Sequence, residues 1–278
     1  MQPTRQIPYL ERDGAELALH IFEPPDGSST AAAAEPRAAA VFFFGGGWTG
    51  GTPTQFYPHC AYLASRGLVA ISAEYRVRGR HGTTPFDAVD DARAAIAWVR
   101  AHASELGVDP SRIAAGGGSA GGHLAACAGV IPDRDGARDS KPDALVLFNP
   151  VTVFAPVTGL TADDRSRQEG IATQLDGQDG APISPYHHVA ASAPPAIVFH
   201  GEADRTVPFR TAELFADAMA AAGARCELHA YAGEDHGFFN YGRGDAFFDT
   251  LRAADEFLAS LGYMEGPPEV EAFGWDEG

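Results

Sequence analysis

Short apolar runs alternate with longer segments of helical periodicity along most of this chain. Parallel strands cannot be joined by tight turns, and the connection between them is usually a helix. The alternation therefore predicts an α/β fold, with a mostly parallel central sheet and helices on both faces. The strand candidates are residues 17–22, 38–44, 68–74, 111–115, 144–149, 196–200 and 225–231, and the first of them is expected to pair at one edge of the sheet.

The segments between these strands carry helix signals. Pro85 begins a segment with acidic residues in its first turns, and Gly107 ends it, as a C-terminal cap would. Residues 208–222 and 245–261 show a similar pattern. Their phenylalanines recur at helical spacing, so we expect them in the core rather than in a ligand site.

A chain of 278 residues can bury one large core, and we predict a single domain. Residues 28–37 are of low complexity and are predicted to form a surface loop. Residues 151–193 are rich in Gly, Pro and polar residues and form a short insertion, too small for a large lid domain. The acidic tail at 265–278 is expected to be loosely held, although Phe273 and Trp275 offer a way to dock it.

The charge of the chain argues against nucleic acid as a partner. The formal net charge is −17, and Lys141 is the single lysine, so arginine supplies nearly all of the positive charge. A surface of this kind repels nucleic acid. Adaptation to a salt-rich environment and the arginine preference of a GC-rich genome are both open as explanations.

The sequence also lacks signals for membranes, disulfides and zinc. No stretch approaches the roughly 18 apolar residues of a membrane span, and no apolar segment follows the basic residues near the N-terminus. We therefore expect a cytoplasmic protein without membrane association, with export open if a leader has been removed. The three cysteines, Cys60, Cys127 and Cys226, are widely spaced and suggest neither a disulfide framework nor a zinc site.

A glycine-rich turn carries the strongest chemical signal. The strand candidate at 111–115 runs into GGGSAGG at 116–122 and then into an apolar, alanine-rich helix, which places Ser119 in a G-x-S-x-G motif at a strand-to-helix turn. This is the context of a nucleophile elbow, in which glycines allow the tight turn and the helix N-terminus presents backbone N–H groups to developing negative charge.

The same residues match the dinucleotide fingerprint G-x-G-x-x-G as Gly116, Gly118 and Gly121. That alternative needs an acidic residue at the end of the next strand, about 20 residues further on. Here the next strand candidate ends in Asn149. A nucleophilic serine is therefore favoured over a cofactor site and over a purely structural glycine turn.

A serine nucleophile needs a base and an orienting acid, and in this kind of fold they follow in the order Ser, Asp, His. Asp204 lies in the loop after the strand candidate at 196–200, and His236 lies in the loop after the next strand. Glu202 and Asp235 are alternatives for the acid. Other histidines lie in predicted strands or helices without a catalytic context: His20, His102, His200 and His229.

A second glycine-rich loop, GGGW, follows the strand candidate at 38–44. The acyl oxyanion needs preorganised donors, and we expect the backbone N–H groups of Gly45, Gly46, Gly47 and Ala120 to form that oxyanion hole. Trp48 is expected to form a wall of the substrate site. A merely flexible turn is the alternative, and the nearby elbow makes it the weaker one.

Together these motifs resemble the α/β-hydrolase superfamily, and within it the esterase/lipase group with an HGGGW-type loop. The resemblance spans nearly the whole chain. It rests on GGGW at 45–48, EYR at 74–76, GGGSAGGHLA at 116–125, HGEAD at 200–204, TVP at 206–208 and DHGFF at 235–239. One position departs from the family pattern, because Phe44 stands where a histidine usually supports the oxyanion loop.

The resemblance implies a carboxylesterase that uses Ser119, His236 and Asp204, forms an acyl-enzyme and needs no metal or organic cofactor. Because the insertion is short, we expect short acyl chains, on acetylated sugars or aryl esters, as small-molecule substrates. Tyr186 and His187 are further candidates for the substrate rim. An amidase or peptidase on the same scaffold and a non-catalytic binding protein remain alternatives, and the oligomeric state is not readable from the sequence.

Overall fold

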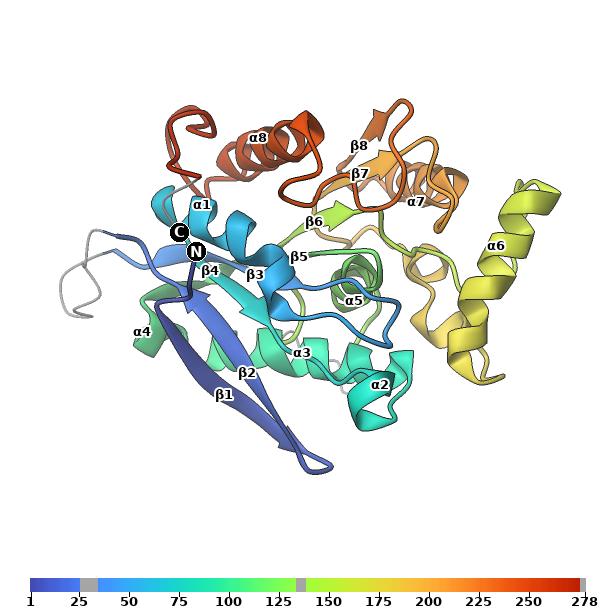
Figure 1. The fold of residues 1–278 in the computed structure, drawn as a ribbon, viewed down its shortest axis with the longest axis horizontal. Helices are drawn as coiled ribbons and strands as arrows, with labels where there is room; N and C mark the ends of the chain where they lie inside the picture. The colour runs from blue at the N-terminus through green and yellow to red at the C-terminus, as the bar shows by residue number, and fades with distance from the viewer. Residues whose placement is uncertain (26–34, 134–138, 276–278) are drawn as a thin grey trace.

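The computed structural model describes residues 1–25, 35–133 and 139–275. The strands in these ranges are β1 (Arg5–Arg12), β2 (Ala15–Phe22), β3 (Arg37–Phe43), β4 (Val69–Ala73), β5 (Val108–Gly118), β6 (Ala144–Phe148), β7 (Ala196–Gly201) and β8 (Cys226–Tyr231). They form one sheet in the order β1-β2-β4-β3-β5-β6-β7-β8 (Figure 1). β2 pairs antiparallel with β1 and with β4, whereas the other pairs are parallel, which confirms the predicted α/β fold.

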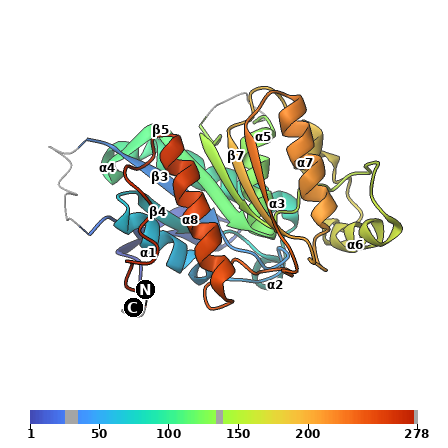
Figure 2. The same ribbon diagram turned by 90° about the horizontal axis from the view of Figure 1, so that it is seen from above.

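Helices cover both faces of the sheet (Figure 1, Figure 2). They are α1 (Tyr57–Ser65), α2 (Arg78–His81), α3 (Pro85–Ala101), α4 (Ala103–Leu106), α5 (Ala120–Val130), α6 (Ala162–Ala172), α7 (Phe209–Ala221) and α8 (Asp245–Ser260), with short 3-10 turns η1 (Pro53–Phe56), η2 (Thr173–Leu175), η3 (Ala181–Ile183) and η4 (Pro185–His188). Because successive strand residues point to opposite faces, Val41 of β3 packs in a core with α3, α5 and α7, while Phe42 packs in a second core with α1 and α8.

The edge of the sheet differs from the prediction. The strand expected at the edge, residues 17–22, corresponds to β2, and β1 pairs outside it. β1 contains Pro8, and its register with β2 shifts between Pro8 and Leu10. A proline has no N–H to donate, so a strand that contains one is tolerated at a sheet edge and is hard to identify from sequence.

The insertion and the tail both contain more order than the sequence indicated. Residues 151–193 hold α6, a mostly polar helix that begins with a capping box between Thr161 and Asp164. The tail up to Trp275 is docked, because the Glu269 N–H donates to the Tyr62 hydroxyl at 3.0 Å and the Trp275 ring stacks on Tyr241. Most of the loop predicted at 28–37 lies outside the described residues.

The loops that carry the candidate site follow the carboxyl ends of β3, β5, β7 and β8. Open parallel sheets bind their ligands at this edge. In the part of the chain that the structure describes, no helix combines the length and the apolar character needed to cross a membrane.

Candidate active site

Ser119 lies between β5 and α5 in a backbone conformation that few residues other than glycine adopt, with φ at 53° and ψ at −116°. The turn is this tight because the backbones of β3 and α5 nearly touch. A Cβ on Gly117 or on Gly121 would overlap the carbonyl oxygen of Phe43. The glycines are therefore required by space, and the turn holds the Ser119 side chain out of the sheet.

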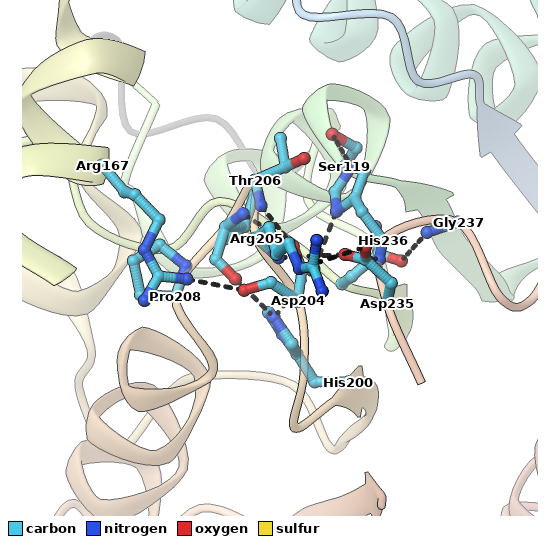
Figure 3. A network of polar contacts seen from close by, with 12 residues as sticks. Ser119, Arg167, His200, Asp204, Arg205, Thr206, Pro208, Asp235, His236 and Gly237 are labelled. Atoms are coloured by element: carbon cyan, nitrogen blue, oxygen red, sulfur yellow. Dashed lines mark hydrogen bonds and ion pairs between the residues drawn. The ribbon is translucent and has the colours of Figure 1, made fainter. Parts of the chain in front are cut away.

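The structure brings Ser119, His236 and Asp204 together in one hydrogen-bonded line (Figure 3). The Oγ atom of Ser119 lies 3.0 Å from Nε2 of His236, and Nδ1 of His236 lies 2.7 Å from Oδ2 of Asp204. An ionised carboxylate can only accept, so Nδ1 carries the proton and Nε2 is left to accept the serine proton. This is the arrangement of a base poised on a nucleophile.

Asp204 is only 2% exposed, yet its surroundings keep it ionised. Its Oδ1 accepts the backbone N–H groups of Thr206 and Val207 at 2.8 and 2.9 Å. Burial on its own would raise the pKa of Asp204, but hydrogen bonds from His200 and His236 outweigh burial and hold this pKa well below its usual range. The acid is therefore an anion at neutral pH.

The alternative acids do not contact the imidazole. Glu202 is exposed on the loop after β7. Asp235 accepts the backbone N–H groups of Arg205, at 3.0 Å, and of His236, at 2.7 Å, so it ties the two loops together. Sequence reasoning treated Asp235 only as a rival acid and missed this bracing contact.

A second histidine touches the acid. His200 is fully buried, and its Nε2 lies 3.0 Å from the Val207 carbonyl oxygen and 3.3 Å from Oδ2 of Asp204. Its place in β7 gave it no catalytic context in the sequence. In the structure its Nε2–H faces both the Val207 carbonyl oxygen and Oδ2 of Asp204, the same oxygen that His236 contacts (Figure 3).

The oxyanion loop adopts the unusual backbone that its glycines permit, with φ at 129° for Gly46 and 59° for Gly47. The Gly45 N–H is already used, because it donates to Oε1 of Gln55 at 2.6 Å. Gly46 and Gly47 therefore remain as candidate donors in this loop. Ala120 is the first residue of α5, where N–H groups lack intrahelical partners, and supplies the third.

A cavity of about 340 Å³ opens beside Ser119. Its walls come from the oxyanion loop, from α6 and from the loop after β7. The lining residues are Gly47, Trp48, Ser119, Val151, Arg167, Gly170, Ile171, Gln174, Arg205, Thr206 and Val207. A larger cavity of about 540 Å³ lies at the opposite edge of the sheet, where β3 and β5 begin, and contains none of the three aligned side chains.

The three predicted rim residues differ in their location. Trp48 lines the cavity and is held by ring contacts with His123 and Phe154. Tyr186 and His187 are on η4 and are not among the lining residues. The Tyr186 N–H donates to a backbone carbonyl oxygen at 2.9 Å, and Nδ1 of His187 lies 2.8 Å from a neighbouring serine hydroxyl, so both belong to a packed turn.

Arg167 of α6 was not anticipated from the sequence. Its guanidinium donates to the Asp204 carbonyl oxygen at 2.7 Å (Figure 3). It also pairs with Asp163 and Asp164 on its own helix. The insertion is therefore tied to the loop that carries the acid. Within the described ranges, no group of three or more His, Cys, Asp or Glu side chains is arranged to hold a metal ion.

Comparisons with known proteins identify the family. The BD-FAE family profile matches residues 26–219. The chain is 47% identical to esterase 2 of Thermogutta terrifontis phosphonylated by sarin, with a TM-score of 0.86 over 94% of this chain and 96% of that one. A propionate-bound structure of the same esterase gives a TM-score of 0.84, at 47% identity and the same coverage of both chains.

Curated relatives match at lower identity. The probable carboxylic ester hydrolase LipM of Mycobacterium tuberculosis is 32% identical over 77% of this chain and 52% of its own length. Esterase LipC of the same organism is 30% identical over 68% of this chain and 50% of its own length. The chain thus spans about half the length of these relatives. The family match and the fold place it in the BD-FAE family, within the esterase/lipase group of the α/β-hydrolases.

Proposed function

We propose that this chain is a serine carboxylesterase that hydrolyses short-chain acyl esters through an acyl-enzyme. The observation that carries the proposal is the hydrogen-bonded line from Ser119 through His236 to Asp204, which begins at a strained strand-to-helix turn. Esterase relatives support the same chemistry.

In the first half of the reaction, Nε2 of His236 takes the proton of Ser119 as Oγ attacks the ester carbonyl carbon. The negative charge that develops on the carbonyl oxygen is stabilised by the N–H groups of Gly46, Gly47 and Ala120. The protonated imidazole then gives its proton to the departing alcohol oxygen. The product of this half-reaction is an ester between the acyl group and Ser119.

In the second half, a water molecule takes the place of the alcohol. His236 removes a proton from this water, hydroxide adds to the acyl carbon, and the same N–H groups stabilise the second oxyanion. The intermediate collapses with cleavage of the bond between the acyl carbon and Oγ, the carboxylic acid leaves, and the proton on His236 returns to Oγ of Ser119. Asp204 stays ionised throughout and stabilises the imidazolium that forms twice in each cycle.

The size of the cavity favours small acyl groups. It measures about 340 Å³, and the insertion reaches it through Val151 and through the α6–η2 segment, which contributes Arg167, Gly170, Ile171 and Gln174. Esterase 2 of Thermogutta terrifontis has been solved with propionate and with butyrate bound. We therefore expect acetyl to butyryl esters, of sugars or of aryl alcohols, as substrates.

Hydrolysis of p-nitrophenyl esters from acetate to palmitate tests this proposal. We expect kcat/KM to be highest between acetate and butyrate and to fall with longer chains, and Ser119→Ala to lower kcat by about 10⁴-fold or more. Ser104→Ala, at an exposed position on α4, is the matched control. Full activity in Ser119→Ala, or a maximum at palmitate, would contradict the mechanism or the substrate class respectively.

A further inference from the structure

The oxyanion loop lacks the histidine that usually supports it in this family, so its support must come from elsewhere. Phe44 stacks on Tyr75 with ring centroids 4.2 Å apart, and the Tyr75 hydroxyl donates to the Phe44 carbonyl oxygen at 2.7 Å. This hydrogen bond holds the start of the oxyanion loop by a carbonyl oxygen, which is an acceptor. The Phe44 ring has no polar atom with which to hold the N–H side of the loop.

Gln55, in η1, supplies that missing contact. Its Oε1 accepts the Gly45 N–H at 2.6 Å. Gly45 itself lies against the elbow, because a Cβ built on it would be 3.0 Å from the Gly118 carbonyl oxygen and 3.4 Å from Cβ of Ser119. The position of Gln55 therefore bears directly on the distance between the oxyanion loop and the nucleophile.

The other end of the Gln55 amide reaches the loop that carries the base. Nε2 of Gln55 donates to Oδ1 of Asn240 at 2.8 Å, across 185 positions of sequence. Nδ2 of Asn240 donates in turn to the carbonyl oxygen of Gly237 at 2.7 Å. Gly237 immediately follows His236 and has φ at 81°, so this carbonyl sets the backbone that presents the imidazole.

The chain of hydrogen bonds has one possible direction. The Gly45 N–H can only donate, so the oxygen of the Gln55 amide faces it and the nitrogen faces Asn240. The carbonyl of Gly237 can only accept, so the nitrogen of the Asn240 amide faces it and the oxygen faces Gln55. Both amide orientations are thus fixed by backbone groups at the two ends, and a carboxylate at either position would break one contact.

We propose that Gln55 and Asn240 are positioning residues that set the spacing between the oxyanion loop and the His236 loop. The inference rests on the proposed function, because it assigns the two amides a role in that reaction. Neither side chain contacts the reacting atoms. Their effect is to keep the oxyanion donors and the base in register on either side of Ser119, where a small displacement is costly for the transition state.

The test compares Gln55→Met, Asn240→Leu and the double variant with the wild type. Both substitutions keep approximate side-chain size and remove the amide. We expect each single variant to lower kcat on p-nitrophenyl acetate by about 10- to 100-fold with KM within about twofold. Because the residues act as one bridge, the double variant should lose about as much as either single variant. Gln6→Met, at an exposed position of β1, is the control.

Gln55→Glu separates positioning from packing. Glutamate can still accept the Gly45 N–H, but its second oxygen faces the Asn240 oxygen, so the Asn240 amide must turn over and lose its bond to Gly237. We expect this variant to recover part of the kcat lost in Gln55→Met. It also retains the size of glutamine, so it can be assayed if Gln55→Met does not fold.

The outcomes separate this inference from the proposed function. Wild-type kcat in folded Gln55→Met, a loss confined to KM, or losses that multiply in the double variant would overturn the bridge while Ser119-dependent esterase activity persists. If the wild type itself has no esterase activity, or keeps it in Ser119→Ala, the proposed function fails instead.

Discussion

His59 is a buried histidine whose substitution should change how stability depends on pH. Its side chain is 1% exposed, and among the residues that the structure describes neither ring nitrogen has a hydrogen-bond partner. The ring is surrounded by the aromatic side chains of Phe42, Phe56, Phe148, Phe239 and Phe247. An imidazolium in this environment would lose its hydration and gain no compensating contact.

The size of the effect follows from the pKa. Burial lowers the pKa of His59 from 6.5 to about 3. Below about pH 6.5, the unfolded chain therefore binds a proton at His59 that the folded chain does not bind. The free energy of unfolding is unaffected by this site above that pH and falls as the pH drops toward 3. At pH 4.5, roughly two pH units below the pKa of His59 in the unfolded chain, this site alone lowers the free energy of unfolding by about 2.7 kcal/mol.

The assay is urea unfolding of the wild type and His59→Leu at pH 7 and pH 4.5. Leucine fills a similar volume and cannot be protonated, so the difference in unfolding free energy between the two pH values should shrink by about 2.7 kcal/mol. At pH 7 the variant should be at least as stable, because two unsatisfied nitrogens are removed. His229→Leu, at a half-exposed position on β8, is the control. If the unfolding free energy of His59→Leu fell between pH 7 and pH 4.5 by as much as that of the wild type, the reasoning would be refuted.

Substitution of two buried aspartates should affect activity in one case and stability in the other. Asp204→Asn keeps the shape of the acid but lets its amide favour the wrong imidazole tautomer, and should lower kcat by about 10⁴-fold; a loss below about tenfold would argue against Asp204 as the acid. Asp91→Ala removes the fully buried carboxylate that accepts hydrogen bonds from the Arg76 guanidinium at 2.8 and 2.9 Å, and leaves Asp13, at 2.6 Å, as the nearest ion-pair partner of Arg76. This variant should lower the unfolding free energy by about 3–5 kcal/mol in a denaturant titration; a change under about 1 kcal/mol would show that the Asp91–Arg76 pair is dispensable.

The parts of the site that were predictable from sequence are those encoded within a few consecutive residues. Ser119 is marked by glycines that the tight turn requires, and Asp204 and His236 each follow a recognisable strand. Because parallel strands end at one edge of the sheet, chain order and strand ends were enough to predict that these three residues meet.

The parts that were missed depend on contacts between distant residues or on weak patterns. Gln55 and Asn240 are half-buried amides 185 positions apart, and nothing in either local sequence indicates that they meet. Without that contact, the Gly45 N–H was taken as a free oxyanion donor. The helix α6 is mostly polar and has no buried residue, so it lacks an apolar stripe, although the capping box at Thr161 was a signal that the sequence did contain.

The central claim is that Ser119 is the nucleophile, and covalent labelling tests it most directly. The protein is incubated with a p-nitrophenyl phosphate triester, released p-nitrophenol is counted, and the modified peptide is identified by mass spectrometry. We predict that one equivalent of p-nitrophenol is released per chain, with the phosphoryl group on Ser119 and no labelling in Ser119→Ala. Labelling at another residue, or equal labelling of Ser119→Ala, would contradict it.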